Sequence, residues 1–152
     1  MAGIELQRAI PADAGAIRAL VREAYAKWVP LIGREPVPMT ADYDRAVLEH
    51  RFHLLLVDDQ LAGVIETVDE DDALLIENVA VAPRFQRQGL GRTLLAHAEQ
   101  IARDLDKPRI RLLTNRLFEE NLRLYRRLGY AVDREEDLGF AVAVHMSKSA
   151  VT

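Results

Sequence analysis

The chain has 152 residues, a formal net charge of −4 at pH 7 and no cysteine. This length suits one domain with a sizeable core, so we expect residues 1–152 to form a single domain. Acidic and basic residues are mixed along the chain, which argues against nucleic-acid binding. The lack of cysteine excludes disulfides, thiolate metal sites and a cysteine nucleophile.

Neither a secretion signal nor a membrane segment is apparent. The N-terminus lacks the basic start and apolar block of a signal peptide, and no apolar run is long enough to span a bilayer. We therefore expect a cytoplasmic protein without a membrane partner. Histidines 50, 53, 97 and 145 have no ligand spacing, so no metal site is predicted.

Hydrophobic periodicity and turn residues divide the first half of the chain into short elements. Asp13 is a plausible N-cap for the first helix, and Thr40 for the second. Residues 29–39 contain three prolines and a glycine, which predicts a loop. In chain order, the predicted elements are strand 3–8, helix 11–28, loop 29–39, helix 40–50 and the hairpin strands 52–57 and 61–68.

The second half begins with a short apolar run that ends at Pro83 and predicts a buried strand. A longer helix follows it, and Gly129 sits at the C′ position of the next helix. The predicted elements are strand 74–81, helix 93–105, strand 110–114, helix 119–128 and strands 130–134 and 140–147. This order predicts an α/β domain around a mixed sheet.

Residues 86–91, Gln-Arg-Gln-Gly-Leu-Gly, lie between the predicted strand 74–81 and its following helix. A strand, a glycine-containing turn and a helix in this order present backbone N–H groups and a positive dipole end to a phosphate. Gly89 and Gly91 allow close approach of the backbone to a ligand. Arg87 and Arg92 add charge on either side. A turn that only joins the strand to the helix is the alternative.

The residues after the turn narrow the class of phosphate ligand. A Walker loop requires Gly-Lys-Ser/Thr, but Arg92-Thr93 follows Gly91. A dinucleotide-binding fingerprint requires a third glycine at the position of Leu94. The remaining pattern is Q-x-x-G-x-G after a strand that ends Val-Ala-Pro.

This pattern resembles the acetyl-CoA pyrophosphate loop of the GCN5-related N-acetyltransferase (GNAT) family, with matches at Gln86, Gly89 and Gly91. Residues 121–130, NLRLYRRLGY, are similar to a second motif of that family, N-x-x-x-Y-x-x-x-G-[FY]. The wider stretch 113–130 resembles a bacterial subgroup of unassigned substrate.

The resemblance implies a mixed, mostly antiparallel central sheet with splayed central strands, flanked by helices. It also implies an N-acetyltransferase that moves an acetyl group from acetyl-CoA to a primary amine of a small molecule or peptide, by direct attack in a ternary complex. A homodimer is compatible with it.

The same resemblance assigns a cofactor site. The freed backbone of residues 79–81 would pair with the pantetheine arm and polarise the thioester carbonyl, and the pyrophosphate would sit on the amides of residues 87–93. The predicted cofactor-binding residues are Val79, Ala80, Val81, Gln86, Arg87, Gln88, Gly89, Leu90, Gly91, Arg92, Thr93 and Asn121.

Two residues are candidates for proton transfer. Tyr125 matches the general acid of the family; its alternative role is that of a core tyrosine at helical spacing. Glu77 is a carboxylate in an apolar strand, which is costly unless it is paired or used. We therefore consider it as the base, acting through water, although exposure at a strand edge explains it equally well. Strand alternation predicts that Glu77 shares a face with Val79 and Val81.

The acceptor is expected on the other side of the sheet, under the first two helices and their loop. The candidate substrate residues there are Tyr25, Trp28, Arg34 and Glu35. Arg34 and Glu35 lie in a proline-bounded loop, and loops of this length tend to carry function. Arg34 is therefore a candidate to hold a substrate carboxylate with two hydrogen bonds. Packing is the alternative for Trp28.

Two other classes of function fit parts of the pattern. A non-catalytic acyl-CoA sensor would keep the phosphate loop but would not need Tyr125. A generic nucleotide-phosphate binder would use the loop alone, and the missing Lys-Ser/Thr argues against it.

Overall fold

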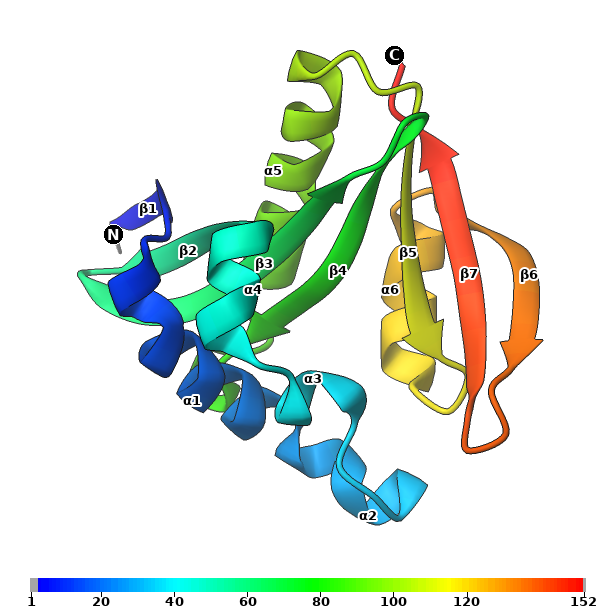
Figure 1. The fold of residues 1–152 in the computed structure, drawn as a ribbon, viewed down its shortest axis with the longest axis horizontal. Helices are drawn as coiled ribbons and strands as arrows, with labels where there is room; N and C mark the ends of the chain where they lie inside the picture. The colour runs from blue at the N-terminus through cyan, green and yellow to red at the C-terminus, as the bar shows by residue number, and fades with distance from the viewer. Residues whose placement is uncertain (1–2, 152) are drawn as a thin grey trace.

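The computed structural model describes residues 3–151 and contains one seven-stranded sheet in the order β1-β2-β3-β4-β5-β7-β6 (Figure 1). All neighbours are antiparallel except β4 and β5, which are parallel. The predicted mixed, mostly antiparallel sheet is therefore confirmed. The strands are β1 Ile4–Arg8, β2 Arg51–Val57, β3 Gln60–Asp69, β4 Ala73–Val81, β5 Arg109–Asn115, β6 Ala131–Asp137 and β7 Val142–Ser149.

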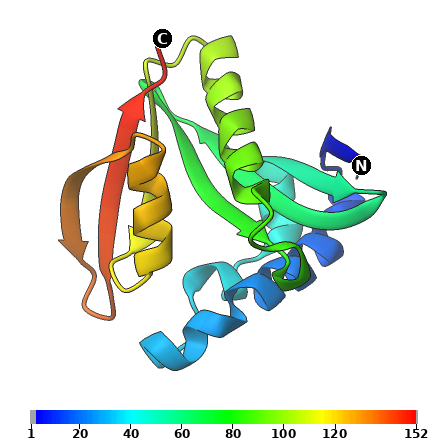
Figure 2. The same ribbon diagram turned by 180° about the vertical axis from the view of Figure 1, so that it is seen from behind.

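Helices cover both faces of the sheet. The helices are α1 Ala14–Tyr25, α2 Val29–Ile32, α3 Val37–Thr40, α4 Tyr43–Glu49, α5 Leu90–Asp104 and α6 Glu119–Arg127. Figure 1 shows α1 and α4 in front of the half of the sheet that contains β2 to β4, and Figure 2 shows α5 and α6 on the opposite face. The fold is thus a three-layer arrangement with the sheet in the middle.

Each face of the sheet has its own hydrophobic core. On the α5 face, Leu94, Leu95 and Ala98 of α5 are buried against Leu55 and Ile65 of the sheet. On the other face, the apolar side of α1 packs on β2 and β3. Full burial of one such large side chain stabilises the fold by about 1.5–3 kcal/mol. These two cores hold β4, the strand that leads into the phosphate loop, from both sides.

The predicted loop over residues 29–39 is wrong, because the segment contains the two single-turn helices α2 and α3. Pro30 and Pro38 occupy the first turns of these helices and Pro36 is the N-cap of α3, positions at which a missing N–H removes no helical hydrogen bond. Gly33 ends α2 in the left-handed conformation, with φ 74°. The same residue types therefore mark helix boundaries here.

The predicted start of the short second helix, at Thr40, is also wrong. α4 begins at Tyr43, and Asp42 is its N-cap, since the Asp42 side chain accepts a hydrogen bond from the Arg45 N–H at 3.2 Å. Thr40 instead donates its hydroxyl to the Val37 carbonyl, closing the turn of α3. Asp42 therefore caps α4 in place of the predicted Thr40.

Three other boundaries differ from the prediction by a few residues. α5 begins at Leu90 rather than 93, directly after Gly89, and β6 and β7 run over residues 131–137 and 142–149. β6 continues through Glu135–Asp137 because it is a largely exposed edge strand, on which polar side chains face solvent.

The parallel pairing of β4 with β5 is short: only Ala73–Ile76 of β4 pairs with Arg109–Leu112 of β5. Beyond this point β5 pairs only with β7, and β4 only with β3. The register between β3 and β4 shifts at the same place, leaving Glu77 as an extra residue in a β-bulge. The central strands therefore splay, as the family resemblance implies.

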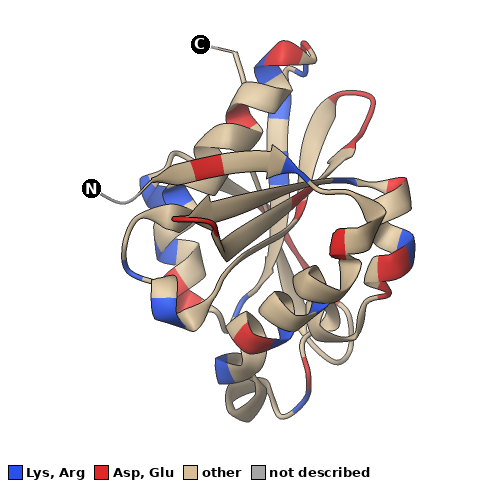
Figure 3. Cartoon of the chain, turned by 90° about the vertical axis from the view of Figure 1, so that its left-hand side faces the viewer, with Lys and Arg blue, Asp and Glu red and all other residues tan. Residues whose placement is uncertain are grey.

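Charged residues of both signs are interspersed over the helices and strands (Figure 3). Within residues 3–151, no helix is both long and apolar enough to cross a membrane.

Gly63 of β3 lies where α5 packs most closely on the sheet. A Cβ at this position would meet the Leu94 side chain at 3.0 Å and the Ala80 carbonyl oxygen at 3.1 Å. We expect Gly63→Ala to lower the free energy of unfolding by roughly 1–3 kcal/mol through overpacking. Chemical denaturation monitored by circular dichroism measures this change.

Gly15→Ala is the matched control, because Gly15 lies in α1 and a Cβ there would contact nothing within 4 Å. It should raise the free energy of unfolding by about 0.5–1 kcal/mol through helix propensity. Equal stability of the two variants would contradict the close packing of α5 on β3.

Candidate active site

Two cavities open beside the splayed part of β4. One, of about 460 Å³, lies along the glycine loop and the start of α5. The other, of about 270 Å³, lies between β4, β5, the α2–α3 segment and the β6–β7 turn. We call them the loop cavity and the apolar cavity. Tyr25, Val79, Asn121 and Tyr125 line both, so the two cavities meet at these side chains.

The loop cavity contains the phosphate-binding geometry predicted from the glycine turn. Gly89 is the N-cap of α5 with φ 79°, and the first-turn residues Leu90, Gly91 and Arg92 line the cavity. The first N–H groups of a helix have no partner within the helix and carry partial positive charge. This helix start is therefore suited to bind an anionic group.

The loop is braced against β4 by Gln86. Its side-chain amide donates to the Val81 carbonyl at 2.9 Å, across the turn that leaves the strand. Arg87, the next residue, has a backbone φ of 64°, which is unusual for a residue other than glycine. Gln86 thus contributes to the shape of the loop as well as lining the cavity.

Most of the predicted cofactor-binding residues are brought together here. Two are not among the lining residues, Gln88 and Thr93. The Thr93 hydroxyl instead donates to the Gly89 carbonyl at 3.2 Å, within the first turn of α5. The predicted residues that do line the loop cavity are Val79, Ala80, Val81, Gln86, Arg87, Gly89, Leu90, Gly91, Arg92 and Asn121.

Positive charge in the loop cavity comes from Arg87 and Arg92, and also from Lys27, which the sequence analysis did not identify. Lys27 lies 3.8 Å from the Glu120 carboxylate, the acidic residue of this cavity. Three cations around one helix start make the loop cavity electropositive, which favours a ligand with several phosphates.

Aromatic stacking joins the two halves of the splayed sheet. Trp28, directly after α1, stacks on Phe118, the N-cap of α6, with ring centroids 4.3 Å apart. The nearby Lys27–Glu120 pair spans the same elements. Of the predicted substrate residues, Trp28 therefore faces the loop cavity and has a packing partner.

Tyr125 lies at the junction of the cavities, on α6, and is 6% exposed. Burial raises the pKa of its hydroxyl to about 12, so the group keeps its proton at neutral pH. Among the described residues, none forms a hydrogen bond with this hydroxyl, and it is not sealed from solvent. The Tyr125 O–H is therefore available to a ligand.

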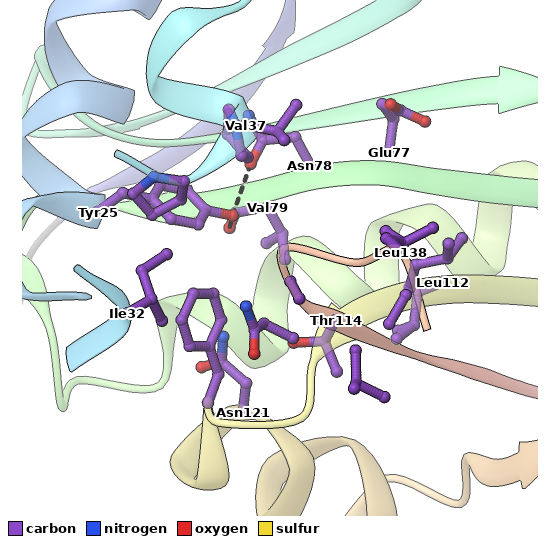
Figure 4. A pocket seen from close by; sticks show the side chains of 18 of the residues that line it. Tyr25, Ile32, Val37, Glu77, Asn78, Val79, Leu112, Thr114, Asn121 and Leu138 are labelled. Atoms are coloured by element: carbon purple, nitrogen blue, oxygen red, sulfur yellow. Dashed lines mark hydrogen bonds between the residues drawn. The ribbon is translucent and has the colours of Figure 1, made fainter. Parts of the chain in front are cut away.

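A chain of hydrogen bonds approaches the junction from the other side, and Figure 4 shows its first bond, between Tyr25 and Asn78. The Tyr25 hydroxyl donates to the Asn78 side chain at 2.9 Å, and the Asn78 amide donates to the Tyr43 hydroxyl at 3.1 Å. Tyr43 in turn donates to the Pro38 carbonyl at 2.6 Å. Burial raises the pKa of both tyrosines, so this chain stays neutral and holds Tyr25 in place.

Glu77 is exposed and lines the apolar cavity. The bulge overturns the prediction from strand alternation: Glu77 is the extra residue, and Asn78, which follows it, turns to the α1 face beside Tyr43. Figure 4 shows the Glu77 carboxylate apart from the Tyr25–Asn78 pair. Within residues 3–151, no basic group lies within ion-pair distance of Glu77.

Of the other predicted substrate residues, two line the apolar cavity and one does not. Tyr25 and Arg34 line the apolar cavity, and Arg34 lies over the Phe140 ring with its guanidinium carbon 4.2 Å from the ring centroid. Glu35 does not line it and instead forms an ion pair with Arg22 at 2.6 Å. Arg34 is thus the loop residue that reaches the cavity.

The sequence analysis missed Asn78, Leu138 and Phe140 at the apolar cavity. Asn78 had a usable signal, since a polar residue in an apolar strand requires a partner. Leu138 and Phe140 flank Gly139, whose φ of 88° marks the tip of the β6–β7 hairpin. Nothing in the local pattern shows that this tip reaches the α2–α3 segment. In the described part of the chain, no cluster of potential metal ligands occurs.

A family model described as the acetyltransferase (GNAT) family matches residues 17–130. This covers most of the chain and includes both motifs. The chain therefore belongs to the acetyltransferase (GNAT) family, and the predicted resemblance is confirmed.

Individual relatives resemble the chain at 30% sequence identity or less. An uncharacterised Bacillus subtilis protein, YxbD, is 30% identical over 83 residues, and the match spans 55% of this chain and about half (51%) of that relative. The PaiA N-acetyltransferase of Thermoplasma acidophilum, solved with coenzyme A, has a TM-score of 0.84 at 19% identity, covering 97% of this chain and 99% of that one. The Escherichia coli ribosomal-protein-S18-alanine N-acetyltransferase has a TM-score of 0.76 at 20% identity, covering 99% and 96%.

These structural likenesses establish the fold, and the family match establishes the class of enzyme. The chain is thus a member of a family of acetyltransferases, which take their acetyl group from acetyl-CoA and transfer it to an amine. The prediction of the cofactor is thereby confirmed.

Gly89 offers a direct test of where acetyl-CoA binds. A Cβ at Gly89 would contact nothing within 4 Å, so a side chain there would project into open space at the helix start. We expect Gly89→Asp to abolish the rise in melting temperature that acetyl-CoA produces, because the carboxylate occupies and repels the phosphate position. Differential scanning fluorimetry measures this shift.

Gly33→Asp is the control for the strain of placing aspartate at positive φ, since Gly33 has φ 74° and does not line the loop cavity. This variant should retain the acetyl-CoA shift. A full shift in Gly89→Asp would move the cofactor site away from the start of α5.

Proposed function

We propose that residues 1–152 act as a single domain that acetylates a primary amine by direct attack within a ternary complex. The observation that carries this proposal is the meeting of the two cavities at Tyr25, Val79, Asn121 and Tyr125. A donor in the loop cavity and an acceptor in the apolar cavity would bring the thioester and the amine together there. Such positioning lowers the entropic cost of a bimolecular step.

The donor is positioned by β4 and α5. The pyrophosphate is held by the N–H groups at the start of α5, with Lys27, Arg87 and Arg92 around it. The pantetheine arm then follows the edge of β4 that β5 leaves free after Ile76. This edge has no partner strand, although the Val79 and Val81 carbonyls of the stretch accept hydrogen bonds from the Tyr25 hydroxyl at 3.4 Å and the Gln86 amide at 2.9 Å. Backbone N–H groups on the edge are suited to stabilise the oxyanion of the tetrahedral intermediate.

The chemistry requires two proton movements. The neutral amine attacks the thioester carbonyl, the tetrahedral intermediate collapses, and the C–S bond breaks. Tyr125 gives its proton to the departing thiolate, and its raised pKa keeps that proton available at neutral pH. The proton lost by the amine passes to Glu77 through water, since Glu77 lines the apolar cavity and forms no ion pair with any of the described residues.

We assign the reaction to the cytoplasm. The donor carries several negative charges, and a charged molecule of that size does not cross a lipid bilayer unaided.

Removing the proton donor should slow the chemical step selectively. We expect Tyr125→Phe to lower kcat by roughly 10²-fold, the scale of one general acid, with little change in acetyl-CoA affinity. Thiol release under saturating acetyl-CoA measures the rate, and calorimetric titration measures the affinity.

Tyr130→Phe is a matched control, because the Tyr130 hydroxyl is buried without a hydrogen-bond partner and lines neither cavity. It removes the same atom from the neighbouring aromatic ring, 6.0 Å from the Tyr125 ring, and should leave kcat unchanged. Equal rates for both variants would return Tyr125 to a packing role.

The pH dependence of the rate tests Glu77. If Glu77 accepts the amine proton, Glu77→Gln should reduce kcat/KM most at low pH, and the acidic limb of the wild-type profile should disappear. Initial rates between about pH 6 and 9.5, an interval that surrounds the ordinary α-amino pKa of about 7.7–8.0, provide the comparison. Two parallel profiles separated by a constant offset would show that the amine arrives neutral and that bulk water takes its proton.

A further inference from the structure

We propose that the acceptor is a small apolar amino acid, whose amine points toward the junction of the cavities and whose carboxylate binds Arg34. This inference rests on the proposed function and adds the chemical class of the acceptor. It is based on the lining of the apolar cavity, on the state of its arginine, and on its size.

The walls of the apolar cavity are mostly hydrocarbon. They are contributed by the α2–α3 segment on one side, and by β5 and the β6–β7 hairpin on the other. The main apolar side chains are Ile32, Val37, Leu112, Leu138, Phe140 and Val142. Such walls favour an apolar body on the acceptor, and therefore an apolar amino acid over a sugar or an extended polyamine.

Arg34 supplies the positive charge of this cavity. Its side chain is positioned by an aromatic ring, and its charge is not balanced by a carboxylate of the described residues. Its guanidinium lies over the Phe140 ring, at 4.2 Å from the centroid. In the described part of the chain, no carboxylate lies within ion-pair distance of Arg34, whereas Arg22 on the neighbouring helix is paired with Glu35. A guanidinium that lies over an aromatic ring still has N–H groups to offer a planar carboxylate.

The charged groups of the cavity suit a zwitterion. Arg34 comes from the α2–α3 segment and faces the hairpin tip, while Glu77 comes from the bulge where β4 leaves β5. An ammonium is attracted by Glu77 as it approaches, and a carboxylate is attracted by Arg34. A second cation on the acceptor, as in a polyamine, would be repelled by Arg34.

The size of the cavity is consistent with this class. Its volume of about 270 Å³ is near the lower end of the range of small-molecule sites, about 300–1,000 Å³. The turn that carries Phe140 is held by a hydrogen bond from the Gly139 N–H to Asp137 at 2.8 Å and another from the Leu138 N–H to the Ala141 carbonyl. The far wall is therefore ordered before a ligand arrives.

The test compares L-leucine with L-leucinamide as acceptors, using thiol release from acetyl-CoA. The two differ only at the carboxyl end, and the amine of leucinamide loses its proton more readily. A preference for leucine therefore cannot come from amine basicity. We expect the KM of leucine to be lower by about 10–100-fold, the scale of a charge-assisted bidentate contact. Spermidine should be a poor acceptor.

Arg34→Gln should raise the KM of leucine to that of leucinamide, with a much smaller effect on kcat and on leucinamide itself. Phe140→Leu removes the stacking ring and should raise the leucine KM by a smaller factor, because Phe140 only positions Arg34. Arg123→Gln, at an exposed arginine of α6 that lines neither cavity, is the matched control and should match the wild type.

The outcomes separate this inference from the proposed function. Leucinamide or spermidine preferred over leucine, or an Arg34→Gln effect equal on both acceptors, would overturn the inference while the acetyltransferase function stands. The same holds if leucinamide or spermidine is acetylated but leucine is not. A protein that neither responds to acetyl-CoA nor acetylates any of these amines would contradict the proposed function itself.

Discussion

The site depends on one constraint, the short parallel pairing between β4 and β5. After Ile76 and Leu112 the strands separate, and the bulge at Glu77 bends β4 at the same point. A β-bulge increases local twist and leaves one residue unpaired, so the end of β4 turns away from β5. This separation opens the two cavities and leaves one edge of β4 free for a ligand. If the pairing continued to the end of β5 at Asn115, the sheet would be continuous and the site would be closed.

The open sheet needs other contacts to hold its halves together. The stacking of Trp28 on Phe118 joins the end of α1 to the start of α6, and Arg34 on Phe140 joins the α2–α3 segment to the β6–β7 hairpin. Each such aromatic or cation–π contact contributes about 0.5–1.5 kcal/mol beyond simple burial. The N-terminal helices therefore connect the halves of the sheet across the cavities, and they also line the acceptor side.

Much of this arrangement could be predicted from local patterns. The glycine turn with Gln86, Gly89 and Gly91 predicted a phosphate-binding helix start, because strand, turn and helix there follow one another directly along the chain. The α2–α3 segment was predicted as a loop, since proline and glycine mark both loops and the boundaries of single-turn helices. The bulge, and with it the face of Asn78, depends on the pairing of β4 with β3. The approach of Phe140 to Arg34 joins residues far apart in sequence, and neither segment shows a pattern that indicates it.

A crystal structure of the complex with coenzyme A tests the central claim most directly. The account predicts a pyrophosphate on the N–H groups of Gly89 to Arg92, a pantetheine arm along the free edge of β4 at Val79 to Val81, and a thiol within hydrogen-bonding distance of the Tyr125 hydroxyl, that is, within about 3.5 Å allowing for sulfur. A coenzyme bound elsewhere, or a thiol directed away from Tyr125, would contradict the claim that the splay of β4 from β5 creates the site of acetyl transfer.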